Sequence, residues 1–483
     1  MANNGGDSVS EGWAGREATA EELVPQIGRL YRDNGVVLSV HGRSLLNRSP
    51  IDILRTHRFA RHVDGHELDI ADTVVLVKAI AALNPGPASV DVARMVSAFR
   101  SSNEADLNAF VAKEMSDVAG LQVDQPSPGR DVVLYGFGRI GRLVARILLA
   151  RASDVTGLRL RAIVVRSGGE KDIVKRASLL RRDSVHGPFN GSITVDEKRN
   201  LIVANGTEIQ VIYSDSPSTI DYTSYGIDDA IVVDNTGRWR DEAGLAQHLE
   251  SKGVARVLLT APGKGSLKNV VFGINHESIE PSDKIITAAS CTTNAITPVL
   301  KVINDEYGVE YGHVETVHSF TNDQNLIDNF HKGDRRGRSA VLNMVLTETG
   351  AASAVAKALP EFAGKLTGNA IRVPTPDVSM AILNLTLERD VEKDELNSFL
   401  RNAALNSSLT KQIDYIESAE VVSTDFLGSR RAGIVDGLAT ITSGNHCVLY
   451  VWYDNEYGYS YQVVRVIEKM AGLSRPSFPA FGK

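Results

Sequence analysis

The most reactive side chain of the sequence lies in the run SCTTN at residues 290–294, where Cys291 is surrounded by hydroxyl and amide groups. Residues 284–288 before it read as a strand, and the residues after it read as a helix to Val302. The N-terminus of a helix stabilises a thiolate over a thiol. The second cysteine, Cys447, lies in an apolar strand pattern typical of a buried small hydrophobic residue. Cys291 is therefore the candidate nucleophile.

A nucleophilic thiol needs a base or a cation beside it, and His318 is the candidate among the eleven histidines. It lies near the end of a strand predicted over residues 312–319, and Thr321 and Asp323 follow in a polar loop. An isolated histidine on a strand is more often a satisfied polar group than a catalyst. Spacing alone therefore leaves both interpretations of His318 open.

A second chemical motif is the loop GFGRIG at residues 136–141, which follows a strand predicted over 131–135 and precedes a helix predicted over 140–150. In a dinucleotide-binding loop, Gly136 would permit a tight turn, Gly138 would let the backbone approach a pyrophosphate, and Gly141 would let helix and strand pack closely. The helix N-terminus adds partial positive charge at the phosphates. Such a run can be a chance glycine-rich turn, but these flanks favour a dinucleotide site.

The next strand of this region is predicted to end at Val165 and is followed by Arg166 and Ser167. A site specific for NAD places a carboxylate at this point for the ribose 2′-hydroxyl. A cation and a hydroxyl instead suit a 2′-phosphate. Glu170 and Asp172 follow closely enough to leave a shifted register open. The pattern favours NADP, or use of both NADP and NAD, over strict use of NAD.

Strand and helix patterns alternate around these motifs, which predicts a parallel α/β sheet. The short strands are expected at residues 160–165, 231–233, 257–260 and 285–287. From about residue 310 the predicted strands are longer and more polar, which indicates a second domain with a more antiparallel sheet. These strands are expected at 312–319, 379–387 and 446–453, and an amphipathic helix at 459–471 ends the pattern.

Residues 16–120 show helical periodicity and no strong β pattern, which predicts an all-α extension of four or five helices. Thr19 with Glu22 resembles a capping box, and Ser49 before a proline resembles a helix N-cap. Residues 122–130 read as a linker and residues 1–15 as disordered. The extension contains no catalytic motif, so it is either an accessory or assembly unit or a solvated helical decoration.

Composition limits the possible partners of the chain. Its 483 residues exceed what one hydrophobic core can hold, and 43% hydrophobic with 23% charged residues is typical of a globular protein. Fifty-two basic and 59 acidic residues, a net charge of −7, argue against nucleic acid as the main partner. We find no membrane-spanning run, no secretion signal and no metal-ligand spacing, and two cysteines suit a reducing cytoplasm.

Together these residues resemble the phosphorylating glyceraldehyde-3-phosphate dehydrogenase family over about residues 130–475. The motifs follow the order of the family and nearly its spacing. They are GFGRIGR at 136–142, DSVHG at 183–187, SCTTN at 290–294, HSFT at 318–321, TGAA at 349–352, RVPT at 372–375 and WYDNE at 452–456. The resemblance divides the chain into the helical extension (1–127), a Rossmann-type dinucleotide-binding domain (128–290 and 454–483) and an α+β catalytic domain with a mostly antiparallel sheet (291–453).

The resemblance implies a role for each residue that matches a family motif. Cys291 would be the nucleophile and His318 its base. The substrate phosphate would be held by Thr321, Asp323 and Arg372, and the inorganic phosphate by Ser290, Thr292, Thr349 and Gly350. The cofactor contacts would be Gly136, Gly138, Arg139, Ile140, Gly141, Arg166, Ser167, Thr236, Thr260, Asn455 and Tyr459. Among these, Asn455 would bind the nicotinamide carboxamide and Tyr459 would pack against the nicotinamide ring.

The activity implied is oxidation of D-glyceraldehyde 3-phosphate with inorganic phosphate to 1,3-bisphosphoglycerate, and its reverse, as in glycolysis and gluconeogenesis. It would pass through a thiohemiacetal and a thioester, in a cytoplasmic homotetramer. Asn329 and Phe330 stand where NAD-specific members have a Leu-Pro pair, which again points toward NADP. Two alternatives stay open: a non-phosphorylating dehydrogenase of the erythrose-4-phosphate type, and a regulatory or scaffold protein that acts through residues 1–127.

Overall fold

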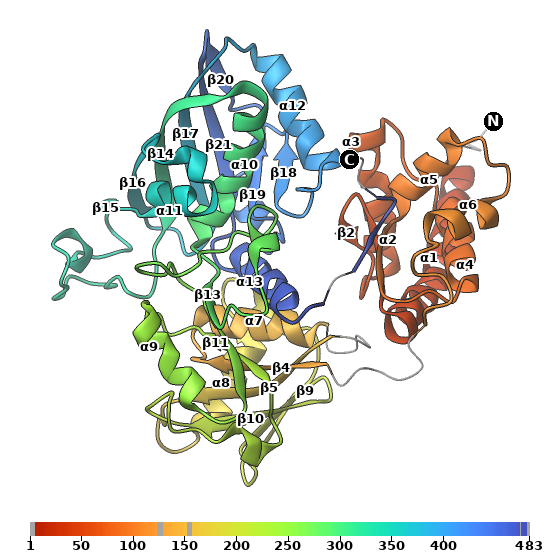
Figure 1. Cartoon of the computed structure of the whole chain (residues 1–483). Coiled ribbons are helices and arrows are strands. Elements are labelled where there is room, and N and C mark those ends of the chain that lie inside the picture. The colour runs from red at the N-terminus through yellow and green to blue at the C-terminus, as the bar shows by residue number, and fades with distance from the viewer. Residues whose placement is uncertain (1–4, 123–128, 152–156, 474, 481–483) are drawn as a thin grey trace. The chain divides into compact units, whose positions relative to one another are not determined.

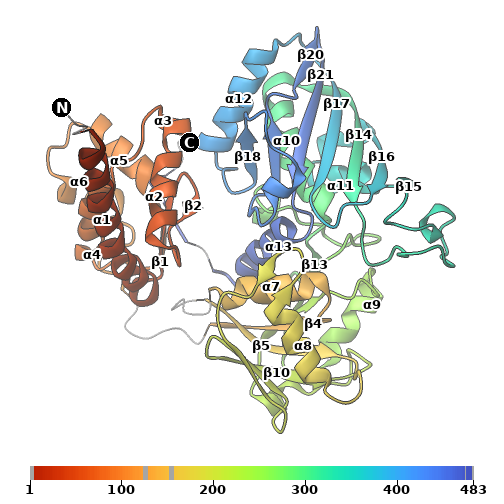
Figure 2. The same cartoon turned by 180° about the vertical axis from the view of Figure 1, so that it is seen from behind.

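The computed structural model describes residues 5–122, 129–151, 157–473 and 475–480 (Figure 1). The described residues divide into two compact units. One unit lies within Met1–Gly129, Ser153–Gly157 and Leu473–Lys483, and the other lies within Arg130–Ala152 and Leu158–Gly472. Figure 2 shows the same elements from behind. The larger unit contains every residue for which the sequence motifs predict a catalytic or binding role.

The dinucleotide-binding half of the larger unit is built on a sheet with the described strand order β13-β12-β11-β4-β5-β10-β9-β8. The strands from β13 to β10 are parallel, and β9 and β8 add an antiparallel edge. The strands are β4 (Arg130–Tyr135), β5 (Leu158–Val165), β8 (Ile193–Asp196), β9 (Leu201–Ala204), β10 (Thr207–Tyr213), β11 (Ala230–Asp234), β12 (Val254–Leu259) and β13 (Ile285–Thr287). The other elements are α7 (Arg139–Leu149), α8 (Asp172–Arg181), α9 (Glu242–Ala246) and the short ladder of β6 (Arg182–Asp183) with β7 (Gly187–Pro188).

This sheet confirms the predicted parallel α/β domain, and its connectivity locates the ligand edge. Strand β4 pairs with β5 on one side and with β11 on the other, so the chain reverses its direction of travel across the sheet at β4. Ligands of open parallel sheets bind at such a switch point, next to the carboxyl ends of the strands. The loop after β4 and the residues just after β5, β11 and β12 therefore meet at one edge.

The catalytic half of the larger unit has a sheet of order β15-β16-β14-β17-β21-β19-β18, with β20 paired to β21. Most of its pairings are antiparallel, as predicted, while β14–β16 and β18–β19 are parallel. The strands are β14 (Val309–Ser319), β15 (Val345–Glu348), β16 (Leu366–Val373), β17 (Ser379–Leu387), β18 (Ile413–Ile416), β19 (Gly433–Asp436), β20 (Ile441–Ser443) and β21 (His446–Tyr453).

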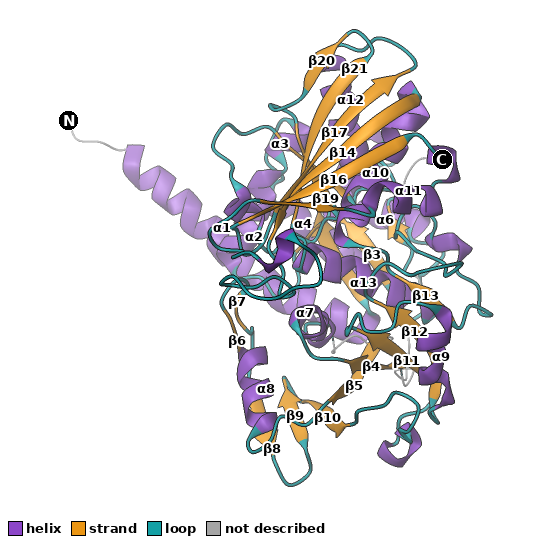
Figure 3. Cartoon of the chain, turned by 90° about the vertical axis from the view of Figure 1, so that its left-hand side faces the viewer, coloured by secondary structure: helices purple, strands orange, loops and turns teal. Residues whose placement is uncertain are grey.

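One face of the catalytic sheet is covered by helices α10 (Cys291–Tyr307), α11 (Ala351–Ala358) and α12 (Lys393–Asn406) (Figure 3). Burial alternates along β17 and β21 because successive strand side chains point to opposite faces. The buried set forms a core with α10, for example Leu300 against Leu383 and Leu449. Cys447 belongs to this core and is buried, as the sequence predicts. Helix α13 (Tyr457–Met470) follows β21 and packs against α7.

The smaller unit corrects the prediction of an all-α extension, because it contains the sheet β2-β1-β3-β22. Its strands are β1 (Val36–Val40), β2 (Arg43–Ser44), β3 (Ala88–Asp91) and β22 (Ser477–Phe478). Its helices are α1 (Gly5–Asn34), α2 (Pro50–Phe59), α3 (Arg61–Asp64), α4 (Ile70–Ala82), α5 (Val92–Ser101) and α6 (Leu107–Glu114). These strands are too short to produce a clear period-two pattern, and β1 and β3 are brought together across a long stretch of intervening helices.

The C-terminal segment differs from the expected domain boundary. We placed residues 454–483 in the dinucleotide-binding domain, but β22 pairs in parallel with β3 of the smaller unit. Phe478 joins the core of that unit at 6% exposure. The final strand therefore completes the sheet of the N-terminal unit, a pairing between chain ends that no local pattern could indicate.

Helix ends in the smaller unit confirm one predicted cap and correct another. The Ser49 hydroxyl accepts a hydrogen bond from the Asp52 amide and Pro50 is the first residue of α2, as predicted. Thr19 instead lies inside α1, where its hydroxyl donates to the Gly15 carbonyl, so the predicted capping box is wrong. Residues from Gly5 onward are helical rather than disordered, while residues 1–4 and most of the predicted linker lie outside the described residues. No described helix combines the length and apolar character needed to cross a membrane.

Candidate active site

The two predicted catalytic side chains meet in the structure. Cys291 is the first residue of α10, and the Ser290 hydroxyl caps that helix by accepting from the Thr293 amide at 3.1 Å. His318 lies near the end of β14 and points its Nε2 at the Cys291 sulfur, 3.5 Å away. The tertiary structure therefore brings the imidazole into contact with the thiol, which the catalytic interpretation of His318 requires.

The other ring nitrogen of His318 is held by the neighbouring strand. His318 and Arg372 are register partners on β14 and β16, and the Arg372 guanidinium lies 2.7 Å from His318 Nδ1. The Ser319 carbonyl lies 2.8 Å from the same nitrogen and also accepts from Arg372 at 3.0 Å. Burial, followed by the Arg372 charge, lowers the pKa of His318 to about 3. A neutral imidazole with its proton on Nδ1, donated to Ser319, leaves Nε2 free to accept a proton from the thiol.

Two opposing effects act on the Cys291 thiol. Burial raises its pKa, while the Arg372 guanidinium and hydrogen bonds from Thr292 act to lower it. The pKa of Cys291 is raised on balance because burial is the largest of these effects, whereas the helix N-terminus alone favours the thiolate. A thiol beside a neutral imidazole would pass its proton to His318 Nε2 as the sulfur attacks an electrophile.

Tyr453 is a site residue that the sequence reasoning missed. Its hydroxyl bridges Thr292 at 2.9 Å and Thr316 at 2.6 Å, and its ring meets His318 edge-on with centroids 6.0 Å apart. It lies in the WYDNE run, but a tyrosine on a buried strand usually reads as core. Because Thr292 is buried and bonded to Tyr453, its hydroxyl fixes the first turn of α10 in the described chain.

The residues predicted to hold the substrate phosphate come from the end of β16 and the loop after β14. Arg372 is the central member, and within the described part of the chain its buried Nε has no hydrogen-bond partner. A buried guanidinium with a vacant donor suits an anion. The Thr321 hydroxyl donates to Asp323, and Asp323 pairs with Arg336 at 2.9 Å. Asp323 is therefore tied to a second arginine and orients this loop through it.

The other predicted anion site involves the N-termini of two helices. Ser290 caps α10, and Gly350 occupies the N-cap position of α11, which packs against α10. The Thr349 hydroxyl accepts from the Ala351 amide at 3.2 Å. A Cβ built on Gly350 would meet nothing within 4 Å, so the backbone is open to an approaching group. Helix N-termini of this kind offer backbone N–H groups to phosphate.

The glycine loop after β4 has the geometry of a pyrophosphate cradle. Gly136 has φ +91°, a left-handed conformation that favours glycine. A Cβ on Gly141 would lie 2.5 Å from the Gly136 carbonyl oxygen, so only glycine allows α7 to start this close to the strand. A Cβ on Gly138 would project into open space at the helix N-terminus, where it would obstruct a phosphate. The loop therefore fits a dinucleotide in each of the three ways the motif predicts.

Two models of one protein family match the larger unit. The NAD binding domain of glyceraldehyde 3-phosphate dehydrogenase matches residues 130–242, and the C-terminal domain of glyceraldehyde 3-phosphate dehydrogenase matches residues 290–455. The chain belongs to this dehydrogenase family. The match supports an oxidoreductase that uses a nicotinamide dinucleotide and a small-molecule substrate.

Comparison with individual relatives distinguishes the part of the chain that is common to the family from the N-terminal extension. The chain is 63% identical over 460 residues to a "glyceraldehyde-3-phosphate dehydrogenase-like protein" of Pseudomonas aeruginosa, covering 95% of this chain and 100% of the relative. It is 39% identical over 342 residues to glyceraldehyde-3-phosphate dehydrogenase of Zymomonas mobilis, covering 70% of this chain and 98% of the relative. Glyceraldehyde-3-phosphate dehydrogenase 1 of Bacillus cereus is 40% identical over 333 residues, with 68% and 95% covered. The smaller unit is thus shared with a long relative.

The other residues predicted to contact the dinucleotide lie along the switch-point edge. The Thr236 hydroxyl donates to Asp234, and the Thr260 hydroxyl donates to the Asp234 carbonyl and lies 3.2 Å from the Asn235 side chain. Asn235 in turn contacts the Gly136 carbonyl at 3.5 Å. This hydrogen-bonded set joins the ends of β11 and β12 to the glycine loop and holds the loop in shape.

Arg139 lies beside the loop but is engaged elsewhere. Its guanidinium pairs with Asp183 at 2.5 Å and with Glu456, so its side chain is not free for the pyrophosphate. Arg139 and Ile140 can serve that group through the backbone N–H groups at the start of α7. The ion pairs join α7 to the β6 segment and to the residue before α13.

At the predicted ribose position the structure accounts for one of the two carboxylates that left the register open, Asp172. Strand β5 ends at Val165, and Arg166 and Ser167 are exposed just beyond it. Asp172 pairs with Arg176 at 2.6 Å inside α8, and a Cβ on Gly168 would collide with its carboxylate. Asp172 therefore helps close the turn after β5, and the cation and hydroxyl stand where the second strand ends.

The predicted nicotinamide contacts lie between the two halves of the larger unit. The Asn455 carbonyl oxygen accepts from the Ser379 hydroxyl at 2.7 Å, which turns the amide NH₂ group outward as a donor. The Ser379 hydroxyl also accepts from the Ser319 amide at 3.1 Å. The Tyr459 hydroxyl donates to the Ala289 carbonyl at 3.1 Å and fixes the strand end just before Ser290. Asn455 is thereby connected through Ser379 to the backbone next to His318.

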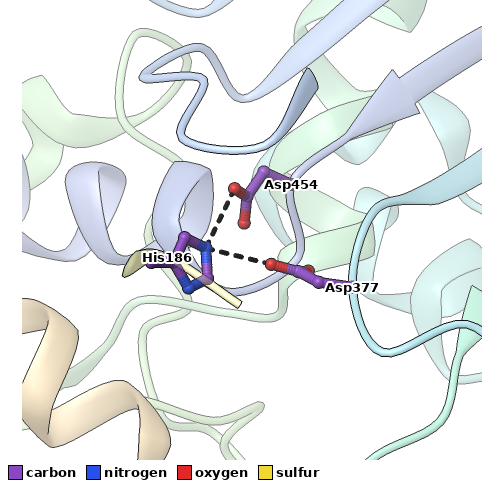
Figure 4. Close-up of side chains that lie close together, drawn as sticks. All are labelled: His186, Asp377 and Asp454. Atoms are coloured by element: carbon purple, nitrogen blue, oxygen red, sulfur yellow. Dashed lines mark hydrogen bonds and ion pairs between the residues drawn. The ribbon is translucent and has the colours of Figure 1, made fainter. Parts of the chain in front are cut away.

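Sequence reasoning also missed the buried ionic group of His186, Asp377 and Asp454 (Figure 4). His186 Nε2 lies 3.0 Å from Asp377 and 3.2 Å from Asp454. Burial alone lowers the pKa of His186, but hydrogen bonds to these two carboxylates outweigh it and raise the pKa to about 10. Burial raises the pKa of Asp377, and the Asp454 charge raises it further. The hydrogen bond from His186 acts in the opposite direction, and the resulting pKa of Asp377 is about 7. His186 is therefore held as an imidazolium beside the two acidic side chains.

Proposed function

We propose that the chain is a phosphorylating glyceraldehyde-3-phosphate dehydrogenase that uses NADP or both NADP and NAD. The observation that carries the proposal is the Cys291 sulfur, at the start of α10, 3.5 Å from His318 Nε2. A nucleophile and base in contact, with an arginine behind the base, suit attack on an aldehyde that carries an anion.

The first half of the reaction uses the thiol and the imidazole. The Cys291 sulfur attacks the aldehyde carbon while its proton passes to His318 Nε2, and His318 then returns that proton to the aldehyde oxygen, which gives a neutral thiohemiacetal. The Cys291 backbone N–H, unpaired by the helix, stabilises the developing oxyanion. His318 accepts the hydroxyl proton when the carbon is oxidised, and the nicotinamide supplies the hydride acceptor. The product of this half-reaction is a thioester on Cys291.

The second half requires inorganic phosphate beside the thioester. Phosphate bound by Ser290, Thr349 and the Gly350 backbone would attack the acyl carbon, release the Cys291 thiolate and yield 1,3-bisphosphoglycerate. Thr292 would contribute through its backbone, because its hydroxyl is held by Tyr453. The substrate phosphate would be bound by Arg372 and Thr321, so separate sets of residues would hold the two anions.

Use of NADP is supported by Arg166 and Ser167 at the end of β5. Both are exposed, and Asp172 is committed to Arg176. An arginine donates charge-assisted hydrogen bonds to a 2′-phosphate. Phe330, at 91% exposure in the segment after His318, is a second difference expected to tolerate the phosphate.

A homotetramer is supported by apolar residues exposed between β14 and β15. Leu326, Ile327, Phe330, Leu342 and Met344 are each at least 65% exposed. Contiguous exposed apolar side chains of this size mark interaction sites, and a second copy of the chain is the occupant that family resemblance implies. Both cysteines are free thiols, which suits a reducing compartment, and we place the enzyme in the cytoplasm.

Parallel kinetics with NAD and NADP, each with and without inorganic phosphate, test the proposal. We expect turnover of glyceraldehyde 3-phosphate to require phosphate and to be supported by NADP. Turnover of erythrose 4-phosphate without phosphate would instead favour the non-phosphorylating alternative. Deletion of residues 1–127 tests the scaffold alternative. If the deletion leaves kinetics and assembly unchanged, the extension acts only on a partner.

A further inference from the structure

The ionic group around His186 joins three segments that are distant in sequence. His186 lies in the turn between β6 and β7, Asp377 lies between β16 and β17, and Asp454 follows β21 (Figure 4). Both carboxylate side chains are completely buried, and the imidazole is 5% exposed. The turn between β6 and β7 therefore sends one cationic side chain between two buried acidic side chains, Asp377 of the catalytic half and Asp454 just after β21.

Asp377 supports a strained part of the active-site backbone. Val378 has φ +64°, a left-handed conformation that is unfavourable for a β-branched residue and persists only where its surroundings enforce it. One Asp377 oxygen accepts from the Val378 amide at 2.8 Å, while the other faces His186. Ser379 follows directly and contacts Asn455 and Ser319. The backbone that supports the nicotinamide contact is thus anchored at Asp377.

Asp454 anchors the second segment. One of its oxygens accepts from the amides of Glu456 and Tyr457 at the start of α13, and the other accepts from the Gly428 amide. Asn455 is the next residue, so the position of its amide depends on Asp454. His186 therefore contacts both segments that meet at the Ser379–Asn455 hydrogen bond.

We propose that His186 is a positioning residue that holds Asp377 and Asp454 together and thereby sets the alignment of Asn455 with the Cys291–His318 pair. This proposal rests on the proposed dehydrogenase function, because that function gives Asn455 the role of binding the nicotinamide. The physical reason is charge. Without a cation between them, the two buried carboxylates either repel each other or one takes up a proton, and either change removes the attraction that draws both segments to the imidazole.

Two further carboxylates favour a cation at this position. The Nδ1 side of His186 faces Asp183 at 3.6 Å and Glu456 at 3.8 Å. The Arg139 guanidinium, 3.3 Å from Nδ1, opposes the charge of the imidazole but is itself paired with both of these carboxylates. The ring stacks on Tyr457 with centroids 5.6 Å apart. A glutamine at this position would keep a hydrogen-bond donor but lose the charge and the stacking, so the two segments would separate.

The test compares His186→Gln with the wild-type chain and with His276→Gln, a control histidine that packs on Phe272 outside the group. We expect His186→Gln to lower kcat at least about tenfold and to change the KM for dinucleotide less than about threefold, because the ribose and pyrophosphate contacts lie on other segments. The control should stay within about twofold of wild type. An equal loss of activity in both variants, or a loss that follows the melting temperature alone, overturns the proposal.

A double variant separates positioning from simple structural damage. Asp377→Asn keeps an acceptor for the Val378 amide but removes one of the two repelling charges. His186→Gln/Asp377→Asn should therefore recover at least about threefold in kcat over His186→Gln, whereas independent structural losses would add. No recovery overturns the proposal. If His186→Gln does not fold, Asp377→Asn alone is expected to lower kcat at least about threefold with dinucleotide KM unchanged, and an unchanged kcat overturns it.

The rate at which iodoacetamide alkylates Cys291, measured without substrate or cofactor, tests the positioning role of His186 independently of the proposed reaction. Because Ser379 contacts the backbone next to His318, His186→Gln should change the alkylation rate at neutral pH more than about threefold, and the control should not. If the wild-type chain fails to oxidise glyceraldehyde 3-phosphate, only the proposed function is lost. If the alkylation rate is the same in His186→Gln and wild type, the positioning role is refuted.

Discussion

Arg372→Gln should impair the enzyme only toward a phosphorylated aldehyde. In the structure Arg372 is the register partner of His318, its Nη1 donates to Ser319, and its buried Nε lacks a partner within the described chain. A substrate phosphate would take the vacant donor and compensate the buried charge. Glutamine keeps a polar side chain of shorter reach but removes the guanidinium charge and its forked donors.

The size of the effect follows from the bonds lost. A hydrogen bond to a charged group contributes about 1.5–3 kcal/mol. At about 1.4 kcal/mol for each factor of ten, that corresponds to a loss of about 10- to 150-fold in kcat/KM. Burial of Arg372 places the estimate toward the upper end, because a buried charged pair is weakly screened.

The assay compares two substrates that differ only in the anion. For glyceraldehyde 3-phosphate we expect the full loss in kcat/KM, mainly through an increase in KM. For glyceraldehyde itself we expect a change within about threefold, because no phosphate is present to lose its partner. Arg389→Gln is a matched control, since Arg389 is an exposed arginine that pairs with Glu306 and Glu395 far from the thiol in sequence and contact.

One result would refute this reasoning. If Arg372→Gln lowers kcat/KM equally for both aldehydes, the guanidinium acts on the Cys291–His318 pair and not on the substrate phosphate. That outcome is physically reasonable because the Arg372 charge acts to lower the pKa of both groups. The two-substrate ratio distinguishes the two roles without a structure of the complex.

Three further predictions test the nucleophile, the cofactor site and the buried ionic group. Cys291→Ser should lower kcat more than about a thousandfold while dinucleotide binding measured by fluorescence is retained. Arg166→Asp should lower the ratio of kcat/KM for NADP over NAD by about 10- to 100-fold, and an unchanged ratio would disprove the ribose assignment. The pKa of His186 is raised from 6.5 to about 10, so its contribution to the free energy of unfolding is complete below pH 6.5 and is lost as pH rises toward 10. Denaturant titrations should show this decline in the wild type and a shallower one in His186→Gln.

The sequence alone predicted the features whose causes are local. Gly136, Gly138 and Gly141 indicate a strand-to-helix turn because the steric need for glycine at each position arises within the loop itself, and the structure has that turn. The start of α10 at Cys291 was predictable for the same reason, since the strand, the cap and the helix are contiguous. The alternation of short strands and helices likewise indicated the parallel sheet.

Only the tertiary structure decided which of these features touch one another. The contact of Cys291 with His318, the position of Arg372 behind the imidazole and the bridge through Tyr453 all depend on the order of strands in the catalytic sheet. The sheet of the smaller unit and the buried group at His186 escaped prediction because their partners come from distant parts of the chain. Local side-chain periodicity carries no information about pairings that form only when remote segments are buried against each other.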